Sequence, residues 1–448
     1  MPLWEFDQRY RRPRVPAQGA RVRDEAVAAE ARQAARAQIA RMHAGEAQGG
    51  HASLPALTYF EEVVAGDGRL AELRATSAPK VALFCNFAPE ELVHAAGAVP
   101  VRVCAGFPGS IAAAEQVLPR DICPLVKSTF GLLTSGAEPV SLCDAAVVPL
   151  SCDPKTKLAQ VLTDYLPTWV IDLPGRRDYV RDMPVWLSEI REFLRWLEKL
   201  TGKSVGRRQL RESIGLFRRR TEAFRALFNL RRRYPHLLSG RGALLVTQAS
   251  FTDDVARWTD QVWALLAELE GEGARQPEPP AGFLPVLLTG APVAWPNWKV
   301  ANVIEEAGAW VVADTLCSGT HRLFDPVVVD EWTTSGMLRA LALRYFSAPI
   351  CPCFVQSADR MDRVIELSRD FHVRGVISHN LRLCQPTDME TTLLREVLKE
   401  EKIPLLVLQT DLGLEDVEQL KTRVEAFLEM TVEAGGSRSE RAGEGKEM

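Results

Sequence analysis

The chain has 448 residues, of which 46% are hydrophobic and 25% charged, and its formal net charge at pH 7 is -4. This length and composition predict a globular protein of two or three domains. A balance this close to neutral gives no general attraction to nucleic acid or to an anionic membrane, and no apolar run reaches the roughly 18 residues of a membrane-spanning helix. We therefore expect neither a nucleic-acid partner nor a membrane partner.

The first segment, residues 1–54, is rich in arginine and alanine. Its start lacks the apolar core of a secretory signal, so a cytoplasmic location is the default expectation. Residues 22–43 predict an exposed helix, because no strong apolar stripe runs along them. Residues 45–54 are rich in Gly and Ala and predict a linker.

Residues 55–280 predict a first α/β domain that includes long helices. The strand expected at 80–84 leads to a helix that begins at Pro89. Glu90 and Glu91 fall in its first turn, where proline and acidic residues are favoured. Further strands are expected at 99–103, 145–150 and 168–172, and long helices with a 3.6-residue apolar period are expected across 186–231.

Residues 281–432 predict a second α/β domain, and residues 433–448 predict a disordered tail. Strands expected at 285–288, 310–313, 375–378 and 404–408 alternate with helices at about 300–308, 360–371, 388–400 and 415–430. Alternating elements with strands that are apolar on both faces predict parallel sheets. The expected fold is therefore α/β, with two doubly wound domains of Rossmann or flavodoxin type and an additional helical segment.

The nine cysteines are the most informative side chains in the chain. In a reducing compartment we expect them to be reduced, buried or bound to metal rather than paired in disulfides. Six lie beside residues that turn the chain or begin a helix, and several directly follow a β-branched run: Cys123, Cys152, Cys317, Cys351, Cys353 and Cys384. Ligands of open α/β sheets bind outside the carboxyl ends of the strands, so thiolates gathered there favour an iron–sulfur site.

The alternative is that each cysteine is a small buried hydrophobic side chain. We keep that interpretation for Cys85, Cys104 and Cys143, which stand in or beside apolar strands. No Cys-x-x-Cys pair or ferredoxin-like spacing occurs, which disfavours zinc-ribbon, thioredoxin and ferredoxin sites. The remaining possibility is a metal site assembled from cysteines that lie far apart in the sequence. It would lie between the domains, because Cys123 and Cys152 belong to the first half of the chain and the other candidates to the second.

Two segments, 84–102 and 152–157, resemble the 2-hydroxyacyl-CoA dehydratase and benzoyl-CoA reductase superfamily. The resemblance runs from about residue 55 to 432. It implies a [4Fe–4S] cluster held by three cysteines, which correspond by position to Cys123, Cys152 and Cys384.

Three further segments, 118–128, 317–319 and 349–353, are similar to the double-cubane cluster proteins of the same superfamily. This closer resemblance implies an [8Fe–9S] double-cubane cluster with six cysteine ligands. The additional ligands would be Cys317, Cys351 and Cys353, with Cys85 as the substitute should one of them not bind.

The resemblance implies an iron–sulfur enzyme that takes low-potential electrons from an ATP-hydrolysing activator and reduces a small substrate. The chain has no Gly-x-x-x-x-Gly-Lys-Ser/Thr loop, so ATP would be hydrolysed by that partner. A second, like subunit is also implied. One alternative is a subunit of a 2-hydroxyacyl-CoA dehydratase with one [4Fe–4S] cluster, which removes water reductively from a CoA thioester. A second alternative is a non-catalytic scaffold with the same fold.

The sequence offers few groups for proton transfer. Glu90, Glu91 and His379 are the candidate catalytic residues, with His94 a further histidine to consider. We prefer favourable placement in a helix dipole as the explanation of the two glutamates, and a hydrogen-bonded surface or core position as that of the histidines.

Three lysines and one glycine complete the candidates. Lys127, Lys155 and Lys157 could supply positive potential beside an anionic cluster, or could be ordinary solvated lysines. Gly290 follows a strand, and could either admit a ligand close to the backbone or form a tight turn.

Overall fold

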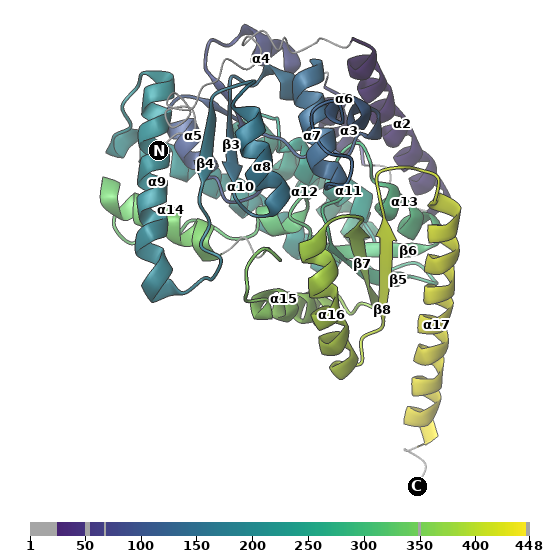
Figure 1. Ribbon diagram of the computed structural model, residues 1–448. Coiled ribbons are helices and arrows are strands. Elements are labelled where there is room, and N and C mark those ends of the chain that lie inside the picture. Colours follow the sequence, from purple (N-terminus) through teal and green to yellow (C-terminus); the bar gives the residue numbers. More distant parts are fainter. Residues whose placement is uncertain (1–24, 50–53, 67–68, 348–350, 445–448) are drawn as a thin grey trace.

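The computed structural model describes residues 25–49, 54–66, 69–347 and 351–444, and shows two α/β units side by side (Figure 1). The first sheet contains β1 (Lys80–Leu83), β2 (Val99–Arg102), β3 (Ala145–Pro149) and β4 (Thr168–Ile171), in the order β2-β1-β3-β4. The second contains β5 (Leu284–Gly290), β6 (Ala309–Asp314), β7 (Gly375–Leu381) and β8 (Leu405–Thr410), in the order β6-β5-β7-β8. All neighbouring strands in both sheets pair in parallel. The predicted α/β fold with two parallel sheets is confirmed.

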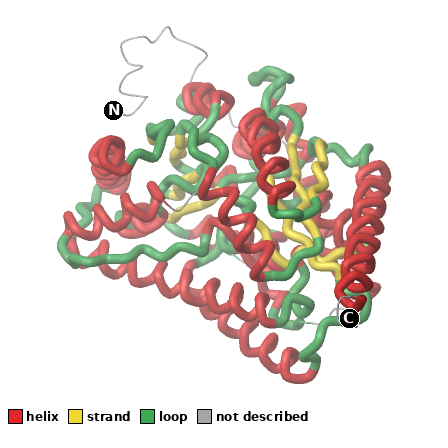
Figure 2. The backbone as a smooth tube through the Cα atoms, turned by 90° about the horizontal axis from the view of Figure 1, so that it is seen from below, coloured by secondary structure: helices red, strands yellow, loops and turns green. Residues whose placement is uncertain are grey.

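Each sheet is covered on both faces, as its strand sequences require. All residues of β3 and β7 are buried. Successive side chains of a strand point to opposite faces, and accordingly Val147 and Val148 pack into different hydrophobic clusters. Figure 2 shows the strands in the interior with helices around them. Burial on both faces explains why these strands are continuous apolar runs.

The helices of the first unit divide between the two faces of its sheet. One face carries α7 (Pro124–Ser135) and α8 (Asp153–Leu162), and the other carries α5 (Glu90–Ala95) and α9 (Tyr179–Thr201). Smaller elements of this part of the chain are α4 (Leu70–Ala75), η1 (Pro108–Ser110), α6 (Ile111–Ala114) and η2 (Val140–Leu142).

The second unit has α13 (Lys299–Glu306), η3 (Thr320–Arg322), α15 (Ala358–Asp370), α16 (Gln385–Glu400) and α17 (Val417–Glu444). Helix α17 continues to Glu444, into the segment where the sequence predicts a disordered tail; residues 445–448 lie outside the described residues. No helix in the described part of the chain is long and apolar enough to span a membrane.

The chain crosses between the two units in both directions. Helix α14 (Thr334–Ser347) follows β6 in sequence, yet its buried side chains join the core of the first sheet, and Trp186 of α9 donates a hydrogen bond to the Ala342 carbonyl (2.9 Å). Conversely, α10 (Arg207–Arg233), α11 (Gly240–Ala249) and α12 (Val255–Arg275) contribute to the core of the second sheet. The domain boundary expected at residue 280 stays a prediction, and the cores on its two sides exchange segments.

The helix expected at 22–43 is confirmed over the described residues from Glu25, but it is exposed on only part of its surface, because one face is buried. Helix α2 (Glu25–Gly49) buries Val27, Ala35 and Met42, and it packs near α3 (Leu57–Ala65). The contact face of α2 consists largely of alanines, which are too weakly apolar to give the stripe that identifies an amphipathic helix. The helix also runs to Gly49, through much of the predicted linker.

Candidate metal centre

Both sheets reverse their strand order at the point where the candidate cysteines lie. The order reverses between β1 and β3 in the first sheet and between β5 and β7 in the second, which creates a crevice at the carboxyl ends of those strands. Cys85 follows β1, Cys152 follows β3 and Cys384 follows β7. The topology therefore explains why cysteines far apart in the sequence come together.

Lys155, in the first turn of α8, is the common neighbour of these sulfurs. Its ammonium donates a hydrogen bond to Cys85 Sγ and interacts electrostatically with thiols from both halves of the chain. Cys384 joins the group through its interaction with Cys123. We call this group the cysteine seam, and its members are Cys85, Cys104, Cys123, Cys152, Cys317, Cys351, Cys353 and Cys384.

The cysteine seam lies where the two α/β units touch. Cys104 and Cys123 from the first unit and Cys384 from the second pack around one small apolar cluster. The cluster consists of Leu125, Ala291, Ala294, Leu381 and Leu412. Asn86 also spans the junction, since its side-chain amide donates a hydrogen bond to the Cys317 carbonyl (2.8 Å). Cysteines from both units thus face a shared, largely buried space.

The structure revises the interpretation of the three cysteines that the sequence placed in the core. Cys143 is fully buried in the hydrophobic cluster between the first sheet, α7 and α8, as expected. Cys85 and Cys104 instead belong to the cysteine seam. Cys104 follows β2 as closely as Cys152 follows β3, and that spacing is the signal that could have identified it.

Two residues of the seam region have left-handed backbone conformations. Cys85 has φ +56° and Leu383, directly before Cys384, has φ +67°. Such angles are uncommon outside glycine and are costly unless the surroundings enforce them. Both positions lie in the short turn between a strand and the helix that follows it.

Burial sets the protonation of most thiols in the seam. It raises the pKa of Cys104 and of Cys123 to about 11, and raises that of Cys317 further, so these sulfurs carry protons at neutral pH. Cys351 behaves oppositely, because a hydrogen bond from Cys353 stabilises its thiolate and lowers its pKa. A metal that replaced the protons would therefore be bound in competition with protonation.

Lys155 balances this group electrically. Burial disfavours its charge, but the neighbouring sulfurs of Cys85 and Cys152 raise its pKa well above the ordinary value. Lys127 does not take part in the same way, since its ammonium binds Glu115 (2.8 Å) and the Arg120 carbonyl (2.6 Å). Lys157 is exposed, in keeping with an ordinary solvated lysine.

Among the described residues, no three His, Cys, Asp or Glu side chains converge on the position of a single metal ion.

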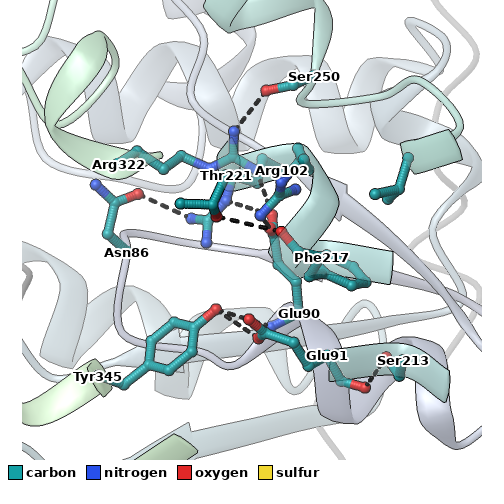
Figure 3. Close-up of polar contacts among 12 residues, drawn as sticks. Asn86, Glu90, Glu91, Arg102, Ser213, Phe217, Thr221, Ser250, Arg322 and Tyr345 are labelled. Atoms are coloured by element: carbon teal, nitrogen blue, oxygen red, sulfur yellow. Dashed lines mark hydrogen bonds and ion pairs between the residues drawn. The ribbon is translucent and has the colours of Figure 1, made fainter. Parts of the chain in front are cut away.

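Beside the seam, the Glu90 carboxylate forms ion pairs with three arginines, two of which, Arg102 and Arg322, are labelled in Figure 3. Arg102 Nε donates to Glu90 Oε1 at 2.6 Å, Arg220 Nη2 to Oε2 at 2.7 Å and Arg322 Nη2 to Oε1 at 2.5 Å. Burial alone would raise the pKa of Glu90, but the three guanidinium groups hold it well below the usual range. Three cations and one anion leave two positive charges in excess, and we call these four residues the Glu90 cluster.

The Glu90 cluster is connected to the seam through the backbone. Arg102 Nη1 donates hydrogen bonds to the Cys85 carbonyl and to Asn86 Oδ1. Arg322 comes from the second unit, where its Nη1 donates to Ser250 Oγ (2.6 Å), and burial lowers its pKa to about 9. None of the three arginines was expected from the sequence, because the cluster exists only where α5, β2, α10 and η3 meet.

The candidate catalytic residues lie in buried or structural settings. Glu90 is fully committed to its arginines, and Glu91 accepts a hydrogen bond from Tyr345 Oη at 2.8 Å (Figure 3). His379 on β7 contacts the Ala291 carbonyl (3.1 Å), and burial lowers its pKa to about 4. His94 is exposed and lies 3.1 Å from Ser213 Oγ. Proton transfer by any of them stays a prediction.

Two roles were considered for Gly290, close approach of a ligand and a structural turn, and the structure supports the structural role. Its φ is +107°, and a Cβ there would lie 2.2 Å from the His379 carbonyl oxygen. The residue is therefore required for the close packing of β5 against β7.

Comparison with known proteins agrees with this architecture. The family described as HGD-D, "2-hydroxyglutaryl-CoA dehydratase, D-component", matches residues 85–431. The chain belongs to this family. The matched residues contain the whole cysteine seam and every strand of the two sheets except β1, which ends at Leu83.

Three relatives align with most of the length of this chain. The chain is 30% identical to the "Putative dehydratase subunit YjiM" of Escherichia coli over 80% of the chain and 93% of that protein. It is 22% identical to the "(R)-phenyllactyl-CoA dehydratase beta subunit" of Clostridium sporogenes, over 77% and 89% respectively. It is 23% identical to one of the subunits of benzoyl-CoA reductase from Thauera aromatica, over 71% and 82%. The resemblance stated from the sequence is thus confirmed for the superfamily.

Proposed function

We propose that the chain is an iron–sulfur enzyme that receives low-potential electrons from an ATP-hydrolysing activator and reduces a small substrate at the cysteine seam. The observation that carries this proposal is the convergence of sulfurs from both α/β units around Lys155, in a chain of the 2-hydroxyglutaryl-CoA dehydratase family. The names of its relatives support reductive chemistry on CoA thioesters.

The residues present fit an iron–sulfur cluster. Cys123, Cys152 and Cys384 would hold one cubane, and Cys317, Cys351 and Cys353 would complete a double-cubane [8Fe–9S] cluster. Soft thiolate ligands suit iron–sulfur clusters, and the partly buried setting would favour a low potential. When bound, such a cluster supplies single electrons to the substrate.

The protein's own groups would support the cluster electrically. Lys155 and the two excess positive charges of the Glu90 cluster lie beside the thiols, where they would stabilise an anionic group. The hydrogen bonds from Arg102 to the Cys85 carbonyl and from Asn86 to the Cys317 carbonyl fix two turns that carry sulfur. Asp314 holds the second of these turns as well, by accepting from the Leu316 and Thr320 amides (3.1 and 2.9 Å).

A 2-hydroxyacyl-CoA dehydratase subunit with one [4Fe–4S] cluster is the second candidate, favoured by the family match. Iron and sulfide analysis of anaerobically purified protein separates the two. Roughly eight irons per chain indicate a double cubane and roughly four indicate a single cubane. Iron near zero in anaerobic material would overturn both in favour of a scaffold.

Cysteine variants assign the ligands. We expect Cys123→Ser, Cys152→Ser and Cys384→Ser each to lower the iron content in either case. Cys317→Ser, Cys351→Ser and Cys353→Ser lower it only if six cysteines bind. Cys143→Ser is the matched control, because Cys143 lies in the core away from the seam.

The relatives named as subunits also support partner subunits for this chain. We propose a homodimer of the 49.7 kDa chain together with a separate activator. Sedimentation equilibrium of the purified protein tests this assembly: twice the chain mass supports it, and the mass of a single chain contradicts it.

A further inference from the structure

A cavity of about 120 Å³ lies between α2 and the segment that follows β2. Its roof is one face of α2, formed by Ala28, Ala31 and Ala35, which recur at helical spacing. Its inner wall contains Arg102 and Cys104, so the cavity adjoins both the Glu90 cluster and the cysteine seam. The family match begins at residue 85, and the roof therefore lies outside the matched region.

The roof is held across the junction of the two units. The N-terminal half of α2 packs on Phe107 and Leu132 of the first unit. Its C-terminal half binds α13 of the second, through reciprocal hydrogen bonds between Gln38 and Asn302 and a two-point ion pair of Arg41 with Glu306 (2.6 and 2.7 Å). One side of the cavity is consequently covered by a helix that is anchored to both units.

The floor of the cavity is equally well fixed. Gly106 N donates to the Trp295 carbonyl (2.9 Å), and a Cβ on Gly106 would lie 2.3 Å from the Ala294 carbonyl oxygen. Arg102 N donates to the Phe251 carbonyl (2.8 Å). Both Phe251 and Trp295 line the cavity, so its aromatic walls are positioned by the same contacts that join the units.

The charges around the cavity favour an anion. Arg102 shares the single carboxylate of Glu90 with two other arginines, and Arg32 of α2 adds a second cation to the lining. Glu138 also lines the cavity, but it forms an ion pair with Arg74. The lining of the cavity therefore carries more positive charge than unpaired negative charge.

The size of the cavity limits the occupant. An enclosed apolar cavity of about 150 Å³ admits a benzene molecule. This cavity, of about 120 Å³, is smaller and has mostly apolar walls, but it is not fully enclosed, so part of an occupant can extend out of it. We propose that it binds a compact carboxylate, with an aromatic ring or short branched chain beneath the alanines of α2 and the carboxylate toward Arg102. This inference goes beyond the proposed function and does not require the cluster.

Fluorine NMR with 4-fluorobenzoate tests the site in the full-length protein. We expect saturable broadening with wild type and at least tenfold weaker binding to Ala31→Leu, whose three added carbons fill the cavity from the roof. The matched control is Ala37→Leu, on the exposed face of the same helix, which should bind as wild type does. Equal binding to wild type and Ala31→Leu, or no saturable binding to wild type, overturns the proposal.

Charge is tested with a neutral analogue and a second variant. We expect 4-fluorobenzyl alcohol to bind at least tenfold more weakly than 4-fluorobenzoate. Arg32→Gln should weaken 4-fluorobenzoate binding severalfold and reduce its dependence on salt. Arg32 is exposed, so this variant keeps the test informative if Ala31→Leu does not fold. Equal binding of the acid and the alcohol would overturn the assignment of a carboxylate.

The two proposals fail separately. Iron is counted in each NMR sample, which is prepared anaerobically. Iron near zero refutes the cluster, and saturable, Ala31-dependent binding in the same sample supports the cavity. Full iron content with no binding of 4-fluorobenzoate refutes the cavity alone.

Discussion

At the scale of single residues, the buried charges are the most sensitive part of the molecule. Glu90 is 3% exposed and forms ion pairs with arginines from three other elements. Removing one partner from such a group leaves uncompensated buried charge, which costs more than the ion pairs contribute when they are intact.

We expect Glu90→Gln to lower the free energy of unfolding by about 3–5 kcal/mol, the range for breaking a buried ion pair. Urea unfolding followed by circular dichroism measures the change. Glu192→Gln, which removes an exposed i,i+3 ion pair with Arg195, should change it by no more than about 1 kcal/mol. Similar losses in both variants would show that burial of Glu90 is unimportant.

His379 makes stability depend on pH. Its pKa is lowered to about 4 by burial, whereas an unfolded histidine titrates near 6.5. The unfolded state therefore binds the proton first as pH falls. The contribution is complete above about pH 6.5 and is lost progressively toward pH 4, by on the order of 3 kcal/mol.

The comparison of wild type with His379→Gln isolates this effect. We expect the free energy of unfolding of wild type to fall more steeply between pH 6.5 and 4 than that of the variant. Parallel pH profiles for the two proteins would show that His379 is protonated in the folded state.

At the scale of elements, the turns that follow the strands decide how the units meet. Strand β2 ends at Arg102, and the segment after it carries Cys104 and Gly106. The backbone of this segment touches the Ala294–Trp295 segment after β5. Glycine is needed at position 106 because the Ala294 carbonyl occupies the place of a side chain.

We expect Gly106→Ala to destabilise the protein by about 1–3 kcal/mol, the usual cost of overpacking, and to lower the iron content of anaerobic preparations. The matched control is Gly175→Ala, where a Cβ would meet nothing within 4 Å. Denaturation midpoints and iron analysis are measured on both. A Gly106→Ala protein with unchanged stability would mean that the backbone around Ala294 can move to accept the added methyl group without loss of stability.

At the scale of the whole molecule, the two α/β units share their cores. Helix α14 leaves the second unit to pack on the first sheet, and α10 spans from Leu210 beside the first core to Leu227 in the second. Helix α2 and the Glu90 cluster add further links. Because these contacts are numerous, we expect the two units to unfold together.

We therefore expect one cooperative unfolding transition, with urea curves from far-ultraviolet circular dichroism and tryptophan fluorescence that coincide. The physical reason is that neither core is complete without segments from the other side. Two separated transitions would show that each unit is stable by itself.

Local pattern was enough to predict much of this molecule. Apolar runs such as those of β3 and β7 lie between helix-starting residues, and this alternation specifies parallel sheets because both faces of each strand must be covered. The placement of cysteines just beyond strand ends could be predicted as well, because the apolar runs show where each strand ends.

The tertiary structure alone decided which side chains meet. Nothing around Arg322 in the sequence distinguishes it from an ordinary surface arginine, and the spacing of Cys104 after its strand does not show which other sulfurs it meets. Their positions depend on strand order and on helices that cross between the units. The sequence of one segment specifies its own periodicity, but long-range contacts depend on the packing of several segments at once. The burial of α2 shows the same limit, because alanines become a packing face only when a matching surface lies opposite them.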